Sequence, residues 1–238
     1  MAPEPEPAGW PRQLATTVVR WGIDGAPLPA PLIGGTGLRL RSALEMAHMV
    51  RFRAERLGLE PAIAELIEEQ ARWNAGTGFL TGMGGFAFLP VQLPVALTAT
   101  WVIQTRLVAT IAALYGLDLE HESVRTQILL TLLGEEAGEV LKQVGVKAGQ
   151  RFAEVQLRRL PASTLAAINR AVGFQLVSRA GGQGVIQLNR AVPLVGGLVG
   201  GGIDYLLTRH LGHHAAATLQ RRSRSGRGNP VIDVDIVG

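Results

Sequence analysis

The sequence has no cysteine, few aromatic residues and almost no lysine, and each shortage excludes something. Without cysteine there are no disulfides and no thiolate metal sites, which fits a reducing cytoplasm. Aromatic residues make up 5% of the chain, so the core must be built from Leu, Val, Ile and Ala. Lys142 and Lys147 are the only lysines, and every other basic residue is an arginine. Arginine suits phosphate and carboxylate recognition, but a composition biased towards Arg, Ala and Gly gives the same count.

The motifs that identify common enzymes and nucleic-acid modules are also missing. There is no GxSxG and no HExxH, and we find no RNP aromatics, zinc-finger ligands or basic zipper. The sequence therefore predicts no catalytic residues, no cofactor and no nucleic-acid partner. The net charge of +4 also suits an anionic membrane surface. Acids and prolines stand at the start where a signal peptide would carry basic and apolar residues, so we expect a cytoplasmic protein.

Charge is missing altogether from residue 73 to residue 105, between Arg72 and Arg106. Glycines fill the first part of this run, and Pro90 and Pro94 break its middle, which predicts a kinked apolar hairpin over 73–117. Three interpretations stay open: a buried core, a hairpin in the membrane interface, and a true span. Arg106 argues against a span, because a charge at mid-membrane costs roughly 2.5–3.5 kcal/mol even on the lenient insertion scale. In the interfacial interpretation Trp73 and Trp101 lie at headgroup level.

The periodicity of the remaining chain predicts a single all-α domain over 42–219, with flexible ends. Residues 1–41 are expected to form a disordered or extended leader, although a short helix from Trp10 to Trp21 is an alternative. Residues 220–238 are expected to form a flexible basic linker followed by a short strand-like tail. In that tail Ile, Val and Asp alternate over 231–237, which predicts a peptide that adds a strand to a protein partner.

Local signals predict where several helices begin, end and bury a face. Ser42 and Glu45 have capping-box spacing, and Gly58 ends the helix that they begin. Gly76 and the GGQG at 181–184 are expected to end two later helices. The faces expected to be buried in the first two helices comprise Leu44, Ala47, Val50, Leu57, Ile63, Leu66, Ile67 and Ala71.

A glycine-rich stretch over 191–204 predicts close packing between helices. Gly196 and Gly200 are four residues apart, as are Gly197 and Gly201, so each pair leaves a flat groove on one helix face. Neither this stretch nor the GTGFLTGMGG at 76–85 has the lysine of a phosphate-binding loop. We therefore interpret both as packing or hinge segments.

Two clusters of polar residues were considered as chemical sites. His210, His213 and His214 share one turn of a predicted helix downstream of Asp204, but no separate ligands complete a metal shell. Carboxylates at Glu135, Glu136 and Glu139, beside Arg125 and Lys142, are more typical of surface ion pairs than of acid–base catalysis. His48 and His121 stand alone. The sequence therefore predicts no metal site.

Four segments together give the chain its resemblance. They are TGFLTGMGGFAFLPVQLPVAL at 77–97, RLVATIAALYGLDL at 106–119, VRTQILLTLLGEEAGEVLKQVGVKAG at 124–149 and INRAVGFQLVSRAGGQGVIQLNRAVPLVGGLVGGGID at 168–204. In order and character they are similar to the bacterial EcsC family over roughly residues 42 to 215. The resemblance implies a helical fold and, through the family's name, an association with an ABC-transport operon. It implies no established activity and no catalytic residues.

Three functions are compatible with these observations. The first is a non-enzymatic, membrane-associated helical protein, accessory to a transport or envelope process at the inner face of the cell membrane, where anionic lipid is a partner. The second is a soluble helical carrier of an apolar ligand or lipid. The third is an enzyme without a recognisable motif.

Overall fold

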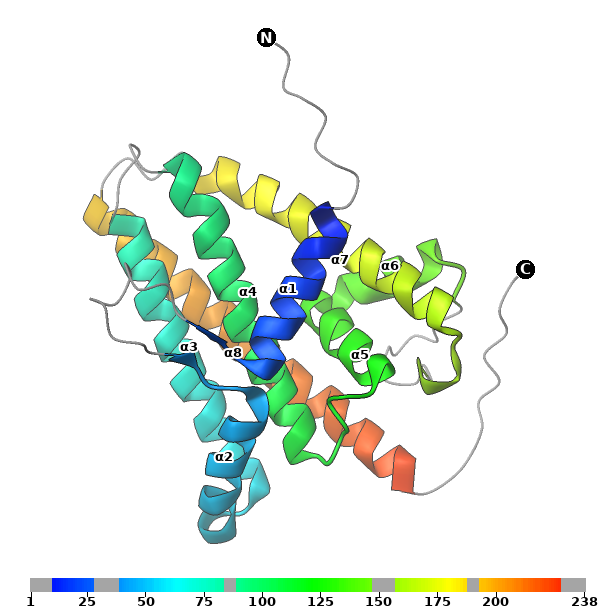
Figure 1. Ribbon diagram of the computed structural model, residues 1–238. Coiled ribbons are helices and arrows are strands. Elements are labelled where there is room, and N and C mark those ends of the chain that lie inside the picture. Colours follow the sequence, from blue (N-terminus) through cyan, green and yellow to red (C-terminus); the bar gives the residue numbers. More distant parts are fainter. Residues whose placement is uncertain (1–9, 28–38, 84–88, 147–156, 188–192, 228–238) are drawn as a thin grey trace.

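The computed structural model describes residues 10–27, 39–83, 89–146, 157–187 and 193–227, and it confirms the predicted all-α domain (Figure 1). Strands are limited, in the described residues, to one antiparallel pair of two residues each. The elements are α1 (Trp10–Asp24), β1 (Ala26–Pro27), β2 (Arg39–Leu40), α2 (Ala43–Leu57), α3 (Leu59–Met83), α4 (Leu89–Leu114), α5 (Glu122–Leu133), η3 (Gly134–Glu136), α6 (Ala137–Gln143), η5 (Leu157–Arg159), α7 (Ala162–Gln187) and α8 (Pro193–Arg227).

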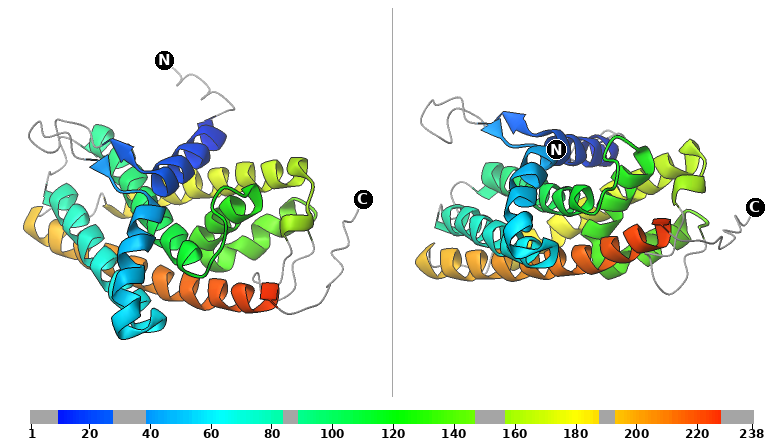
Figure 2. Two further views of the ribbon diagram at one scale, coloured as in Figure 1. Left: turned by 60° about the horizontal axis from the view of Figure 1, so that its bottom comes forward. Right: turned by 90° about the horizontal axis from the view of Figure 1, so that it is seen from below.

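Helix α4 is the centre of this arrangement. It contacts α1 on one side and the paired helices α3 and α8 on the other, with α2 and α5 also against it. Seen from below, α1 and α8 lie on opposite sides of the molecule with α4 between them (Figure 2). This position explains the end of the charge-free run and the apolar residues that follow it: side chains from Trp101 to Tyr115 are buried, apart from the half-buried Gln104. For these residues the buried-core interpretation is correct.

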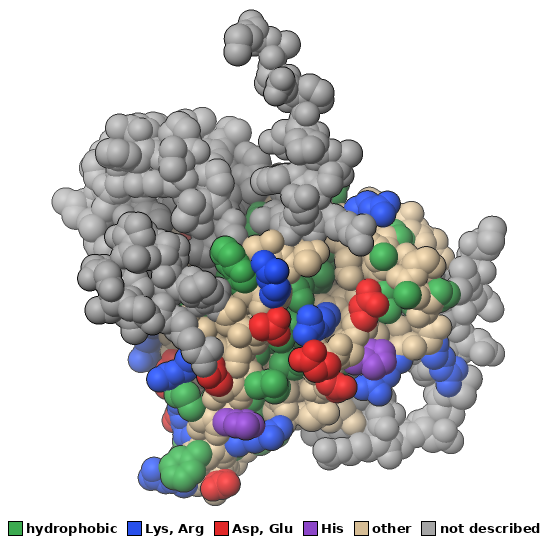
Figure 3. Space-filling model, viewed as in Figure 1, with side chains coloured by type: hydrophobic (Ala, Val, Ile, Leu, Met, Phe, Trp, Pro, Cys, Tyr) green, Lys and Arg blue, Asp and Glu red, His purple; other side chains and the backbone are tan. Residues whose placement is uncertain are grey.

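Charged residues lie on the outward faces of the helices. Acidic and basic side chains are interspersed over the described surface on the face shown in Figure 3. Arg53 of α2, for example, pairs with Glu65 at 3.2 Å and Glu69 at 2.6 Å on α3. Such partly exposed pairs contribute about 0–1 kcal/mol each, so they orient the helices more than they stabilise them.

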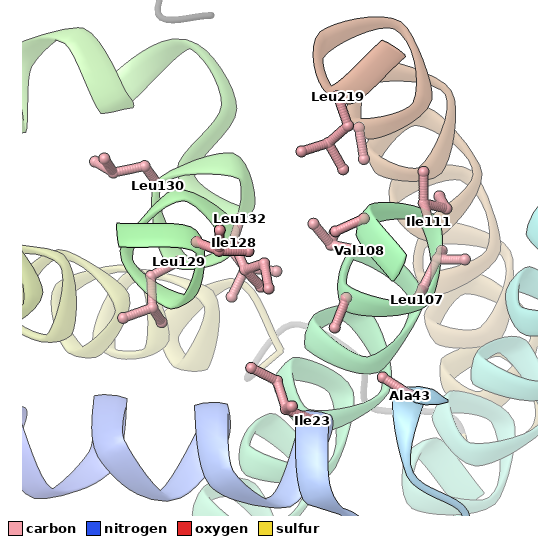
Figure 4. Packing of buried hydrophobic residues seen from close by; sticks show 14 of the residues in the cluster. Ile23, Ala43, Leu107, Val108, Ile111, Ile128, Leu129, Leu130, Leu132 and Leu219 are labelled. Carbon is pink, nitrogen blue, oxygen red and sulfur yellow. The ribbon is translucent and has the colours of Figure 1, made fainter. Parts of the chain in front are cut away.

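The core is continuous and almost wholly aliphatic. Leu107, Val108 and Ile111 of α4 belong to one buried cluster with Ile128 of α5, Leu219 of α8 and Ile23 of α1, and Val108 lies on the side of α4 that faces α5 (Figure 4). Each of these side chains is at most 2% exposed. Full burial of one such side chain contributes about 1.5–3 kcal/mol. The low aromatic content is therefore compensated by many closely packed aliphatic residues.

Helix α1 corrects the predicted leader over 1–41. Residues 10–24 are helical, and Val18 and Ile23 are 0% and 2% exposed in the common core. Gly22 lets α1 approach α4, because a Cβ at this position would lie 2.6 Å from the Thr105 Cβ. The domain thus begins before residue 42. The alternative of a short helix near Trp10 was the better interpretation.

The predicted capping box of α2 is confirmed. The Glu45 amide donates to the Ser42 hydroxyl at 3.1 Å, and the Ser42 amide donates to the Glu45 carboxylate at 2.8 Å. Gly58 ends the helix with a φ of +87°, which favours glycine. The predicted inward face is only half right, since Leu44 and Leu57 are 48% and 46% exposed. Ala43 and Met46 are buried beside Ala47 and Val50, so the buried stripe is rotated.

Three predicted helix ends are wrong. Helix α3 continues through Gly76 to Met83, and α7 continues through the glycines at 181–184 to Gln187. Helix α8 runs to Arg227, so the first part of the predicted linker over 220–238 is helical. Glycine only weakens a helix by roughly 1 kcal/mol, which tertiary packing can offset. The predicted docking peptide at 231–237 lies outside the described residues.

Candidate functional site

Four helix ends without charged residues meet at one end of the molecule. They are the end of α3, the start of α4, the end of α7 and the start of α8 (Figure 1). No Asp, Glu, Lys or Arg occurs at 73–83, 89–105, 180–187 or 193–203. We call this part of the molecule the uncharged end. The charge-free run recognised in the sequence is half of it, and the fold supplies the other half.

The antiparallel pairing of α3 and α8 places two of these ends side by side. The Asn74 amide donates to the Thr208 hydroxyl at 2.7 Å in the core, and the Gln220 amide donates to Glu60 at 2.6 Å near the other end. As residue numbers increase along α3, the numbers of the residues opposite them on α8 therefore decrease. At Gly212 a Cβ would lie 2.8 Å from the Ile67 side chain, so glycine allows the two helices to approach closely.

The close-packing prediction for the glycine-rich stretch concerned different glycines. Gly200 and Gly201 are buried on α8, and the side-chain environment of positions 196 and 197 lies outside the described residues. Gly212 was not predicted, because it stands alone among charged and histidine residues rather than at a four-residue spacing. Its role follows only from what lies opposite it on α3.

Four exposed apolar side chains of α3 and α8 lie at the base of the uncharged end. Leu206 is 63% exposed, Trp73 59%, Leu207 47% and Ile203 40%. Because Asn74 faces Thr208, Trp73 lies at the same level along the helix pair as Leu206 and Leu207. The expectation that Trp101 shares this position is wrong, since Trp101 is 8% exposed within the core. We call Trp73, Ile203, Leu206 and Leu207 the apolar belt.

A charged network adjoins the belt. The Tyr205 hydroxyl and the Arg209 Nε both donate to the Glu68 carboxylate at 2.6 Å. These hydrogen bonds lower the pKa of Glu68 and raise the pKa of Tyr205. A carboxylate held ionised in this way suits an ion-pair and hydrogen-bond connection between α3 and α8 better than proton transfer.

Arg106 is the most unusual polar residue beneath the uncharged end. Its side chain is 6% exposed, and its Nη2 donates to the Gln70 Oε1 at 2.9 Å. Its buried Nε has no hydrogen-bond partner, and no carboxylate pairs with it among the described residues. Burial lowers the pKa of Arg106 to about 10, and the nearby Arg41 contributes to the shift. In the sequence, Arg106 can be recognised as a single arginine within a long apolar segment.

The histidines of the first polar cluster differ in exposure. His210 and His213 are exposed, and burial first, then His210, lowers the pKa of the half-buried His214. Across the described residues, no group of three His, Cys, Asp or Glu side chains is arranged to hold a metal. Sequence reasoning treated His121 as uninformative, yet its Nδ1 accepts from the Ser123 amide at 3.2 Å and caps α5.

The acidic cluster is also dispersed. Glu135 and Glu139 are exposed, while the Glu136 carboxylate accepts from the Gln175 amide at 2.8 Å. Arg125 pairs with Glu120 at 3.2 Å and with Asp24 at 3.7 Å instead of with this cluster. The contact with Asp24 could not be foreseen while residues 1–41 were interpreted as a leader.

None of the helices in the described parts of the chain combines the length and apolarity needed to cross a bilayer. A model of the EcsC protein family matches residues 46–223, which is most of the chain. No curated protein and no solved structure matches the chain.

Proposed function

Because the chain belongs to the EcsC protein family, we propose a non-catalytic role for its helical domain at a membrane. In this proposal the uncharged end of the domain binds the membrane surface. The location proposed is the inner face of the cell membrane, where it assists a transport or envelope process. The observation that carries the proposal is the apolar belt at the base of four helix ends without charge.

Insertion of the end, rather than a span, fits the arrangement of these residues. Tryptophan is favoured at the boundary between headgroups and acyl chains, and Trp73 lies on the belt. Leu206 and Leu207 would leave water at the same depth. Burial of a leucine side chain contributes about 1.5–3 kcal/mol, so a few such residues support reversible binding.

Charge supports the same orientation. Arg72 directly precedes the uncharged part of α3, and Arg209, which pairs with Glu68, follows the apolar residues of α8 by less than one turn. Both are exposed. A basic residue near an anionic membrane surface contributes about 1 kcal/mol, and salt screens this attraction. We therefore expect binding that strengthens with anionic lipid and weakens as salt rises.

Flotation with vesicles tests the proposal. Wild-type protein is mixed with phosphatidylcholine vesicles that contain or lack phosphatidylglycerol, at low and at moderate salt. We expect it to float with the anionic vesicles. Leu206→Asp should lower the partition coefficient by about ten-fold or more. The variant loses the burial of a leucine side chain, about 1.5–3 kcal/mol, and each 1.4 kcal/mol of binding free energy corresponds to about ten-fold.

Phe52→Asp is the matched control. Phe52 is 70% exposed on α2, away from the uncharged end. Its replacement changes apolarity and charge in the same way as Leu206→Asp and should leave flotation unchanged. Wild-type protein that ignores anionic vesicles at both salt concentrations would exclude the proposal, as would equal losses in the two variants.

A further inference from the structure

Two arginines on neighbouring segments, Arg41 and Arg106, have no carboxylate partner among the described residues. Arg106 is buried on α4, and Arg41 is exposed between β2 and α2. The Thr110 hydroxyl, one turn after Arg106, donates to the Ala43 carbonyl at 3.4 Å, which brings the Arg41 segment against this part of α4. Arg41 also lies close enough to lower the pKa of Arg106.

Neither guanidinium is neutralised by an acid in the described part of the chain. Arg41 donates to the Met49 sulfur at 3.4 Å, a weak acceptor, and Arg106 to the neutral Gln70 amide oxygen. Arg53, Arg125 and Arg209 pair with acids. An unpaired but exposed arginine such as Arg56 is solvated, whereas Arg106 is buried. A buried cation without a counter-ion is costly, and a bound anion would offset that cost.

The geometry points to a phosphate-binding site formed by Arg41 and Arg106, which takes the phosphate group of a phospholipid or of a soluble phosphate ester. Arg41 is exposed, Arg106 is buried, and the Thr110–Ala43 contact brings the Arg41 segment against the part of α4 that carries Arg106, so one anion would be bound by both guanidinium groups. The unpartnered Nε of Arg106 supplies a free donor. Two guanidinium groups from different elements need several acceptor oxygens on one small anion, and a phosphate group has them.

The inference goes beyond membrane binding, and only its phospholipid form rests on the proposed function. The site lies under the uncharged end, so a headgroup bound there would connect the lipid surface to α2, α3 and α4. A soluble ester would bind with no membrane present. The two sources differ only in what is attached to the phosphate.

Isothermal titration in the absence of vesicles tests the site. The probes are inorganic phosphate, dihexanoylphosphatidic acid below its micellar concentration, and acetate as a carboxylate control. We expect both phosphate probes to bind wild-type protein and acetate to bind much more weakly. Dihexanoylphosphatidic acid at least ten-fold tighter than phosphate would identify the phospholipid form, and equal affinities would identify the soluble form.

Variants assign the binding to these residues. Arg41→Gln changes an exposed side chain and should weaken phosphate binding by about ten-fold or more, since a charge-assisted hydrogen bond is lost. Arg106→Gln should do the same, with its fold checked by circular dichroism. Arg56→Gln on α2 is the control, because Arg56 is exposed and has no ion pair in the described residues.

The phosphate site is refuted if neither phosphate probe binds wild-type protein, if acetate binds as tightly, or if Arg56→Gln weakens binding as much as Arg41→Gln. The titration contains no membrane, so it separates this inference from the proposed function. A protein that binds phosphate but ignores vesicles retains the site. One that floats but binds no phosphate probe retains only the membrane surface.

Discussion

At Gly212 the absence of a side chain allows α8 to pack closely against α3. Replacing it with alanine places a Cβ 2.8 Å from two carbons of Ile67, whose branched side chain has little room to move. Overpacking of this kind typically costs about 1–3 kcal/mol, which outweighs the gain of roughly 1 kcal/mol from alanine's helix propensity. We expect Gly212→Ala to lower the thermal melting temperature.

Gly202→Ala is the control in the same helix. Gly202 is exposed, and a Cβ there would meet nothing within 4 Å. Only the propensity gain applies, so this variant should melt at a higher temperature than wild type. Changes of the same sign in both variants would contradict the close contact at Gly212.

His214 predicts a dependence of stability on pH. Burial, then His210 and Arg221, lower its pKa below 6.5 in the folded protein. The unfolded chain therefore binds the proton more readily, and the free energy of unfolding should fall as pH drops from about 6.5 through the folded pKa. Above pH 7 both states are neutral at this residue and the effect vanishes.

Urea unfolding from pH 7.5 to pH 5 measures this effect. His214→Gln should flatten the decline of stability with falling pH. His213→Gln, one position earlier and exposed, should retain the wild-type decline. If His214→Gln follows the wild-type curve, other groups cause the pH dependence.

At the scale of elements, α1 is an integral helix of the domain. It contacts α4 and α7, and it buries Val18 and Ile23. Deleting residues 1–24 removes at least these two core side chains, at about 1.5–3 kcal/mol each. That is a large share of a typical stability of 5–15 kcal/mol. We expect a melting temperature lowered by many degrees, or loss of a cooperative transition.

Deletion of residues 1–9 provides the comparison. It removes only chain that precedes α1 and should leave the melting curve unchanged. Circular dichroism at 222 nm follows both proteins. Equal stability of the two truncated proteins would restore the domain boundary near residue 42.

At the scale of the whole molecule, the end of α8 packs against the bundle. Its last turns contact the opposite end of the bundle from the uncharged end, where the Ser223 hydroxyl donates to the Tyr115 carbonyl at 3.0 Å. Deletion of 229–238 should leave thermal unfolding unchanged. Deletion of 220–238 should destabilise the protein, because it also removes the Gln220–Glu60 hydrogen bond.

The two truncations also bear on residues 231–237, whose proposed role is to bind a protein partner. Only the shorter truncation tests that role on an intact domain. An equal loss of stability in both truncations would show that the tail contributes to the fold, contrary to the prediction.

Features that depend on a few neighbouring residues could be predicted from the sequence by itself. The helical class, the Ser42–Glu45 capping box, the stop at Gly58 and the buried face of Ile63, Leu66 and Ile67 follow from local hydrogen bonding and the 3.6-residue period. The resemblance to the EcsC family was visible for the same reason, because it lies in the order of such segments.

Features that depend on which helices meet were decided only by the tertiary structure. Sequence alone could not separate Trp101, which neighbouring helices cover, from Trp73, which is exposed, because both lie in the same charge-free run. Nor could it show that Gly212 faces Ile67, or that Gln70 is the partner of Arg106. Periodicity defines the faces of one helix, whereas burial and pairing depend on crossing positions that residues far apart in the chain determine together.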